Sequence, residues 1–249
     1  MAVKIGLIGC GAIGAEIARA LDRGIMDATL VAVCDHNPET ASALIERLEY
    51  KPVKARLEEL VALADVVVEA ASQRAVPAVA RESLSRGKSL LIMSVGALAD
   101  RDLFAEVKRL ANENRAKVYL PSGAISGLDG LKSARIGGLS RITLTTTKNP
   151  RGLQGAPFIQ EKGIDLSALA GPTLIFQGSA LDAVKAFPAN VNVAATLFLA
   201  AEKSEVQVKV VADPDIQINQ HEILVEGDFG RISIPVSYTH LTLPTINSV

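Results

Sequence analysis

Apolar runs alternate with helical patterns along the first 120 residues of the chain. Amphipathic stretches of helical length separate the runs, and the first has Ile13, Ile17 and Leu21 on one stripe. Strands that alternate with helices in this way predict a parallel sheet with helices on both faces. Five short, largely apolar segments are the expected strands: Val3–Ile8, Leu30–Cys34, Val66–Ala70, Leu90–Met93 and Lys117–Leu120.

The pattern changes after Pro121, where apolar residues begin to alternate with polar ones. A period of two residues is typical of strands in an antiparallel sheet with one buried face. The expected elements are strands at Arg141–Thr147, Val206–Val210, Ile223–Val225 and Ile232–Ile234, with a helix over about 189–202. Gly227–Gly230 separates the last two strands and predicts a hairpin.

Composition and charge narrow the class of protein. Hydrophobic residues make up 49% of the chain and charged residues 21%, as in an ordinary globular protein. The formal net charge is -1 and no basic block is present, so nucleic acid is not an expected partner. No apolar run is long enough for a membrane span, and a strand follows Met1 directly, so we expect a cytoplasmic protein. Cys10 and Cys34 are expected to be free thiols, and no metal site is expected.

A glycine-rich turn follows the first predicted strand. Gly9-Cys10-Gly11-Ala12-Ile13-Gly14 has the G-x-G-x-x-G pattern, an amphipathic helix begins inside it, and Asp35 ends the next strand. Gly9 permits a tight turn, Gly11 lets the backbone approach a pyrophosphate, and Gly14 allows close packing of helix and strand. The amides of Ala12 and Ile13 then face the phosphates, and Asp35 accepts hydrogen bonds from a ribose. A purely structural turn is the alternative.

Other loops at the same edge of the sheet are expected near the dinucleotide, because ligands bind beyond the carboxyl ends of parallel strands. Ala71 and Ser72 follow the third predicted strand, and Ser94 follows the fourth. The acidic Asp35 disfavours a 2′-phosphate, so NAD is the expected cofactor. NADP is the alternative, because a protonated His36 would tolerate that phosphate.

Four later segments resemble the L-aspartate dehydrogenase family: Pro121–Asp129, Phe187–Ala195, His221-Glu222 and Gly227–Gly230. The resemblance runs from Lys4 to about Ile234. It implies NAD(P)-dependent oxidative deamination of L-aspartate to iminoaspartate. The imine then hydrolyses to oxaloacetate and ammonia or enters pyridine nucleotide biosynthesis. The resemblance also implies a homodimer.

The resemblance assigns roles to three residues. Ala124 matches a position whose backbone amide meets the cofactor, Asn190 matches a cofactor-binding asparagine, and His221 matches the active-site histidine. The chemistry agrees, because a group that titrates near neutrality can serve both proton removal from the amine and attack of water on the imine. From the pattern alone, a strand histidine is more often structural, and Asn190 also fits a helix cap.

The two carboxylates of aspartate need cationic or amide partners. Lys148, at the end of an alternating strand, is the first candidate, and Lys185 and Arg231 are others. Most lysines and arginines are solvated surface residues, which is the alternative for each of the three.

The predicted fold class is α/β: a Rossmann-type doubly wound parallel sheet with a second, smaller α+β domain. Residues 1–121 form the predicted dinucleotide-binding domain, and residues 122–235 the substrate, catalytic and dimerisation domain. Residues 236–249 have no helical stripe, contain Pro244, and depart from the final helix that the family pattern continues with. We interpret them as an atypical tail.

Two other functions compete with this interpretation. One is a reductase of the dihydrodipicolinate type, or a sugar or polyol oxidoreductase, on the same nucleotide domain. Sugar enzymes of this kind usually have a Lys-Pro pair after the fourth strand, where this chain has Ser94-Val95-Gly96. The other is a non-catalytic NAD-sensing module, which would bind a dinucleotide without turnover.

Overall fold

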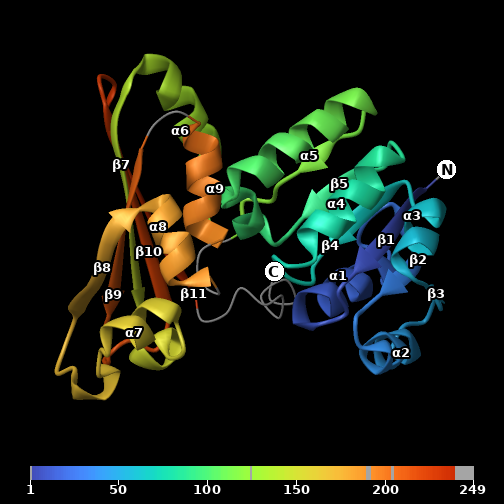
Figure 1. Cartoon of the computed structure of the whole chain (residues 1–249), viewed down its shortest axis with the longest axis horizontal. Coiled ribbons are helices and arrows are strands. Elements are labelled where there is room, and N and C mark those ends of the chain that lie inside the picture. The colour runs from blue at the N-terminus through green and yellow to red at the C-terminus, as the bar shows by residue number, and fades with distance from the viewer. Residues whose placement is uncertain (1, 124, 189–191, 203–204, 239–249) are drawn as a thin grey trace. The chain divides into compact units, whose positions relative to one another are not determined.

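The structure is a computed structural model that describes residues 2–123, 125–188, 192–202 and 205–238 (Figure 1). The described chain forms two compact units, one up to Pro121 and the other from Ser122 onward. Among the described residues, no helix is long and apolar enough to cross a membrane.

The first unit contains a six-stranded sheet whose paired strands are all parallel, in the order β3-β2-β1-β4-β5-β6. Its strands are β1 (Val3–Ile8), β2 (Ala28–Cys34), β3 (Val53–Lys54), β4 (Val66–Glu69), β5 (Ser89–Ile92) and β6 (Val118–Tyr119). The order reverses between β1 and β4, so their carboxyl ends form the switch point at which doubly wound sheets bind ligands.

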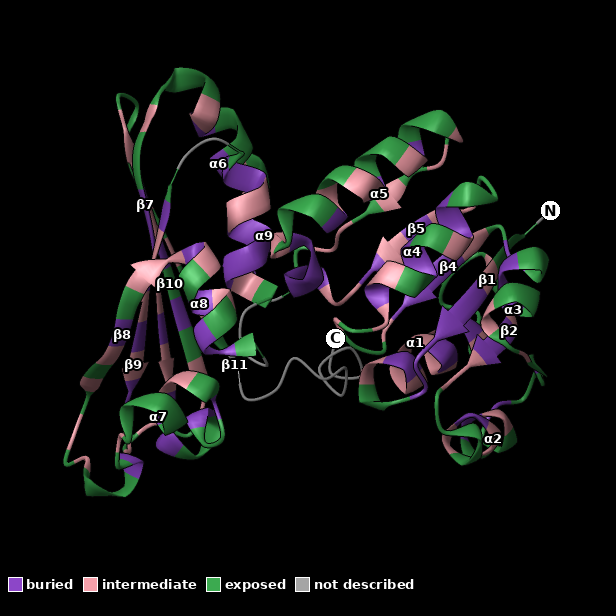
Figure 2. Cartoon of the chain, in the orientation of Figure 1, coloured by how far each residue is buried: buried purple, intermediate pink, exposed green. Residues whose placement is uncertain are grey.

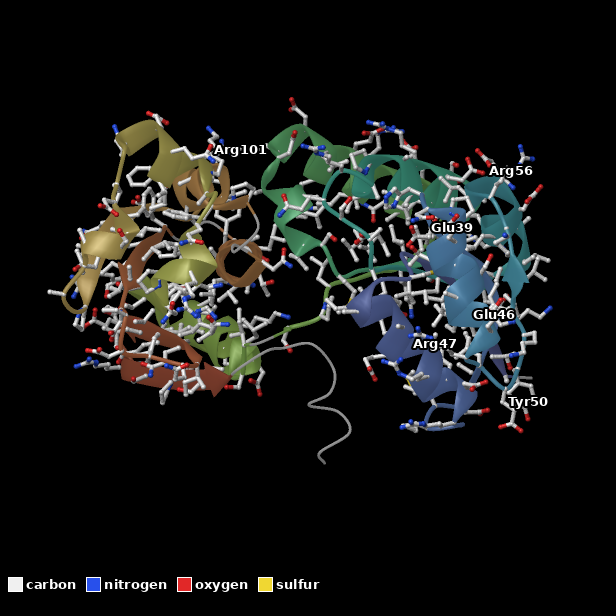
Figure 3. All side chains as sticks on the ribbon, turned by 90° about the horizontal axis from the view of Figure 1, so that it is seen from below. Glu39, Glu46, Arg47, Tyr50, Arg56 and Arg101 are labelled. Atoms are coloured by element: carbon white, nitrogen blue, oxygen red, sulfur yellow. The ribbon has the colours of Figure 1, made fainter. Side chains whose placement is uncertain are left out.

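Helices cover both faces of this sheet: α1 (Ala12–Asp22) and α2 (Pro38–Glu46) pack on one face, and α3 (Leu57–Leu63), α4 (Val76–Ser85) and α5 (Arg101–Glu113) on the other (Figure 1). Successive residues of β1 face opposite layers, because Leu7 joins the core under α1 and α2 whereas Gly6 lies against Leu60 of α3. The charged side chains of Glu39 and Glu46 on α2, and of Arg47 just after it, are exposed (Figure 3).

Local sequence explains where these helices begin. The side chain of Asn37 accepts a hydrogen bond from the backbone N–H of Glu39, and Pro38 occupies the first turn of α2. Asp100 caps α5 in the same way. The elements that sequence reasoning missed, β3 and α3, are short; β3 has only two residues, too few to show a period.

The second unit contains a five-stranded sheet in the order β11-β10-β7-β9-β8. Its strands are β7 (Leu139–Lys148), β8 (Thr173–Ser179), β9 (Val206–Ala212), β10 (Asn219–Gly227) and β11 (Gly230–Tyr238). The predicted hairpin is β10–β11. Strand β7 is antiparallel to β10, as its alternating pattern predicted, but it is parallel to β9, which the pattern did not predict. A period of two reports one buried face and does not report strand direction.

One face of the second sheet is buried under α8 (Ala180–Ala186) and α9 (Asn192–Ala201), and α6 (Leu128–Ala134) contacts α9. In β9 every second residue is buried and the intervening ones are half-buried, as Figure 2 shows for the alternating colours of the strands. Three phenylalanine rings close the core, with centroids 5.3–5.7 Å apart: Phe158, Phe176 and Phe187. Short helices α6, α7 (Pro157–Lys162) and α8, and strand β8, were not predicted.

Candidate active site

The glycine-rich turn joins β1 to α1 at the carboxyl edge of the parallel sheet. Gly9 has a φ of +94°, and a Cβ at this position would lie 2.5 Å from the carbonyl oxygen of Ala70. Gly14 is equally constrained, because a Cβ there would lie 1.8 Å from the carbonyl oxygen of Gly9. Both positions therefore need glycine for the packing of the protein itself.

Gly11 differs from the other two glycines of the motif. It is exposed, and a Cβ built on it meets nothing within 4 Å. Among the described residues, none requires glycine here, so the space above Gly11 fits a ligand that approaches the backbone closely. Ala12 and Ile13 begin α1 next to it, ahead of the first helical hydrogen bond from Ala15 N–H to the Gly11 carbonyl. This edge thus has the features needed to bind a pyrophosphate.

Asp35 lies beside the turn with its carboxylate nearly buried, at 8% exposure. One oxygen accepts a hydrogen bond of 2.7 Å from the backbone N–H of Cys10, and the other accepts one of 2.9 Å from Asn37. His36 Nδ1 lies 3.0 Å from that second oxygen, and the imidazole itself is exposed. Asp35 therefore ties the end of β2 to the glycine turn, a contact that the sequence did not reveal.

Cys10 and Cys34 are free thiols in the same region. Burial raises the pKa of Cys10 to about 12, with smaller contributions from Asp35 and Cys34. Burial also raises the pKa of Cys34. Both groups remain protonated at neutral pH and are poor nucleophiles.

Ala71 and Ser72 lie in the exposed loop after β4, and Ser94 lies after β5. All three donate backbone N–H hydrogen bonds to the carboxylate of Glu69, which is fully buried. Sequence reasoning missed Glu69, although an acidic residue at the end of the apolar run Val66–Ala70 is the signal that could have found it.

His221 lies on β10 in the second unit, with 3% exposure. Its Nδ1 shares a hydrogen bond of 2.8 Å with the hydroxyl of Thr146 on the neighbouring strand β7. Burial, together with a smaller contribution from the charge of Lys148, lowers the pKa of His221 to about 4. The imidazole is therefore neutral at physiological pH and can accept a proton.

Lys148 lies two residues beyond Thr146 on the same face of β7, and burial lowers the pKa of its amine. Lys148 and Thr146 line a small cavity with Phe187, Ala194 and other apolar side chains. The fold thus brings His221, Thr146 and Lys148 into one buried cluster, although Thr146 and His221 are separated by 75 residues in sequence. Nothing in the local sequence marked Thr146.

The other predicted residues fall into two groups. Lys185 on α8 and Arg231 on β11 are exposed, so neither belongs to the buried cluster. Ala124 and Asn190 lie outside the described residues. Within the described ranges, no group of three or more histidine, cysteine or acidic side chains is arranged to hold a metal ion.

Comparisons with known proteins match the two units of the chain to two different family descriptions. Residues 9–121 match the family described as homoserine dehydrogenase, NAD binding domain. Residues 129–245 match the family described as aspartate dehydrogenase, C-terminal. The predicted Rossmann-type fold class is confirmed by these matches and by the parallel sheet.

The chain is 49% identical to L-aspartate dehydrogenase from Methanosarcina mazei over 94% of its length and 87% of the relative's. It is 42% identical to the enzyme of that name from Nitrosopumilus maritimus, over 94% of this chain and 86% of the relative.

Solved structures extend the comparison. Aspartate dehydrogenase from Thermotoga maritima matches with a TM-score of 0.72 and 26% identity over 99% of this chain and 94% of that one. A scyllo-inositol dehydrogenase from Lactobacillus casei with bound NAD(H) shares the fold alone, at a TM-score of 0.62 and 16% identity, over 94% of this chain and 76% of that one. The chain belongs to the L-aspartate dehydrogenase family.

Proposed function

We propose that the chain is an NAD(P)-dependent L-aspartate dehydrogenase that converts L-aspartate to iminoaspartate. The observation that carries the proposal is the buried imidazole of His221, which bonds to Thr146 and is electrostatically coupled to Lys148, in a chain of this family. A buried base beside a cation suits a substrate that must lose a proton while its carboxylate is held.

The dinucleotide would be held by the glycine turn, by Asp35 and by the loop at Ala71 and Ser72. The open backbone at Gly11 fits the pyrophosphate, and the amides of Ala12 and Ile13 supply hydrogen-bond donors. A dinucleotide held there would supply the acceptor for the hydride that leaves the α-carbon of aspartate. Asp35 favours NAD, because its carboxylate repels a 2′-phosphate.

His221 serves as the base in this proposal. Loss of hydride from the α-carbon requires a neutral amine, and His221 removes the proton of the substrate ammonium group. Once that proton has passed to solvent, the same imidazole accepts a proton from the water that attacks the imine, and the adduct expels ammonia to give oxaloacetate. Thr146 fixes the orientation of the ring through its hydroxyl.

Lys148 binds one carboxylate of aspartate and thereby changes the basicity of His221. In the absence of substrate, the charge of Lys148 lowers the pKa of His221. A carboxylate bound to Lys148 offsets that charge and raises the pKa of His221 toward the working pH. Substrate binding thus makes the base stronger.

The assembly and cellular role follow the family resemblance. We place the protein in the cytoplasm as a homodimer that supplies pyridine nucleotide biosynthesis, and light scattering during gel filtration tests the dimer. A monomer at micromolar concentration would contradict it.

The activity is tested by mixing the protein with NAD and L-aspartate and following NADH formation at 340 nm. D-aspartate, L-glutamate and a polyol serve as alternative substrates, and NADP as the alternative cofactor. Dihydrodipicolinate, which a reductase would reduce, is tested separately with NADH, whose consumption is followed instead. We expect the highest rate with L-aspartate and NAD.

The matched variants are His221→Ala and His36→Ala, because His36 is an exposed histidine beside the nucleotide turn. His221→Ala should reduce kcat by about 100-fold or more, the contribution typical of general acid–base catalysis. His36→Ala should retain kcat. Equal rates for His221→Ala and the unaltered protein would remove the imidazole from the mechanism, and binding without turnover of any substrate would favour an NAD sensor.

A further inference from the structure

Glu69 ends the central strand β4, where it lies between Ile8 of β1 and Ile92 of β5. Its side chain is fully buried, at 0% exposure. Burying a carboxylate in an apolar strand is costly unless hydrogen bonds satisfy its oxygens. The surroundings of Glu69 therefore need an explanation beyond core packing.

Four hydrogen bonds reach the two oxygens of this carboxylate. Oε1 accepts from the backbone N–H of Ala71 at 2.9 Å, from that of Ser72 at 3.0 Å and from the Ser94 hydroxyl at 2.9 Å. Oε2 accepts from the backbone N–H of Ser94 at 3.0 Å. One side chain thus binds the loop after β4 and the loop after β5 at the same time.

The two loops lie at the half of the sheet opposite Asp35. In doubly wound sheets, one half receives the adenosine part of a dinucleotide and the other half receives the nicotinamide part. Asp35 follows β2 in the first half, so the loops after β4 and β5 belong to the nicotinamide half. Ala71 and Ser72 are exposed while Glu69 is buried, so the carboxylate holds the loop from its inner side.

We propose that Glu69 is a positioning residue for the nicotinamide half of the cofactor: its buried carboxylate fixes the loops at Ala71–Ser72 and at Ser94 in one arrangement before the dinucleotide binds. A preformed arrangement lowers the ordering cost of binding, which raises affinity. Loss of the carboxylate therefore weakens binding of the nicotinamide part of the dinucleotide. The adenosine part is still held by the glycine turn and Asp35.

The test compares NADH with ADP by calorimetry, because ADP carries the adenosine and diphosphate but no nicotinamide. In Glu69→Gln, either placement of the amide turns its NH2 group toward a backbone N–H, either that of Ser94 or those of Ala71 and Ser72. We expect the Kd for NADH to rise about 10-fold or more, the effect of one lost charged hydrogen bond, while the Kd for ADP changes less than about 2-fold. Hydrogen exchange at residues 71–72 and 94 should accelerate without any ligand.

Asp22→Asn is the matched control. Asp22 also accepts two backbone hydrogen bonds, from Glu49 and Tyr50, but it lies at the end of α1 away from the carboxyl edge of the sheet. This variant should bind both ligands as the unaltered protein does.

Ser94→Ala removes one of the four bonds and decides the matter if Glu69→Gln does not fold. It should raise the Kd for NADH by about 3-fold and leave the Kd for ADP unchanged, because three of the four bonds to the carboxylate remain. Equal weakening of NADH and ADP, or no change for either, would overturn the proposal. Aspartate takes no part in these measurements, so their outcome is separate from that of the substrate assignment.

Discussion

The two candidate binding regions of this protein are built in opposite ways. The dinucleotide edge of the first unit uses backbone: a turn of six consecutive residues and loop amides held by the carboxylates of Asp35 and Glu69. The cluster in the second unit uses side chains from separate strands, His221, Thr146 and Lys148. Steric fit should therefore dominate at the first region, and desolvated charge at the second.

The largest effect is expected from a methyl group in the glycine turn. Gly14→Ala places a Cβ 1.8 Å from the Gly9 carbonyl oxygen, so the variant should lose dinucleotide binding and several kcal/mol of stability, about 3 or more. Gly11→Ala has open space around it and should lose no more than about 1 kcal/mol, the cost at a helix cap, while NADH affinity falls about 10-fold. Thermal unfolding and NADH titration distinguish the two. Similar melting temperatures for both variants would contradict the claim that the packing of the protein requires glycine at position 14 but not at position 11.

The second prediction concerns how stability depends on pH because of the buried imidazole of His221. The pKa of His221 in the folded protein is about 4, below its unfolded value near 6.5, so the unfolded chain takes up the proton first as the pH falls. Stability is intact above pH 6.5 and decreases toward pH 4, by about 3 kcal/mol in total. Between pH 7 and pH 4, the free energy of unfolding of His221→Gln should therefore fall by about 3 kcal/mol less than that of the unaltered protein. Urea unfolding at both pH values measures the difference.

His36→Gln is the control for this measurement, because the side chain of His36 is exposed. It should follow the unaltered protein at every pH. An unchanged acid dependence in His221→Gln would mean that the imidazole is solvated in solution.

The third prediction concerns the charge beside the base. Lys148→Met should raise the KM for L-aspartate by about 10- to 100-fold, as expected for a lost charged hydrogen bond, with little change in NAD affinity. It should also shift the acid limb of the pH–rate profile upward, because the Lys148 charge lowers the pKa of His221. Lys185→Met, at an exposed lysine on α8, is the control and should match the unaltered enzyme. A normal KM for Lys148→Met would assign the substrate carboxylate to another residue.

The smallest effect is expected at the cysteine of the glycine turn. With a pKa of about 12, the Cys10 thiol is ionised in only about one molecule in ten thousand at pH 8, so iodoacetamide should modify it slowly. A Cys34→Ser variant isolates Cys10 for mass spectrometry, and the urea-unfolded protein provides the fast reference. Labelling of the folded protein at the unfolded rate would show that the turn opens readily.

Much of the first unit follows from local sequence. Strands β1, β2, β4 and β5 belong to a sheet that helices cover on both faces, so they appear as largely apolar runs, and Asn37 and Asp100 mark helix starts. The glycine motif is contiguous, so its pattern is visible without tertiary information. The short β3 and α3 escaped prediction because two and seven residues are too few for a period to emerge.

The second unit was less predictable, because its sheet mixes parallel and antiparallel pairs and its short helices depend on tertiary packing. Lys148 and His221 were found as candidates, one by its charge and the other by family resemblance. The sequence did not predict that the two residues lie in one buried cluster, because it does not show which strands pair.

The sequence by itself determined the alternation of strands and helices, the nucleotide-type turn and the family. Those features depend on neighbouring residues, whose spacing is fixed by the chain. Tertiary structure alone decided that Glu69 binds two loops and that Thr146 bonds to His221 across 75 residues. Such contacts arise only when strands pair and water is excluded, and that exclusion is what shifts the pKa of a histidine far from its ordinary value.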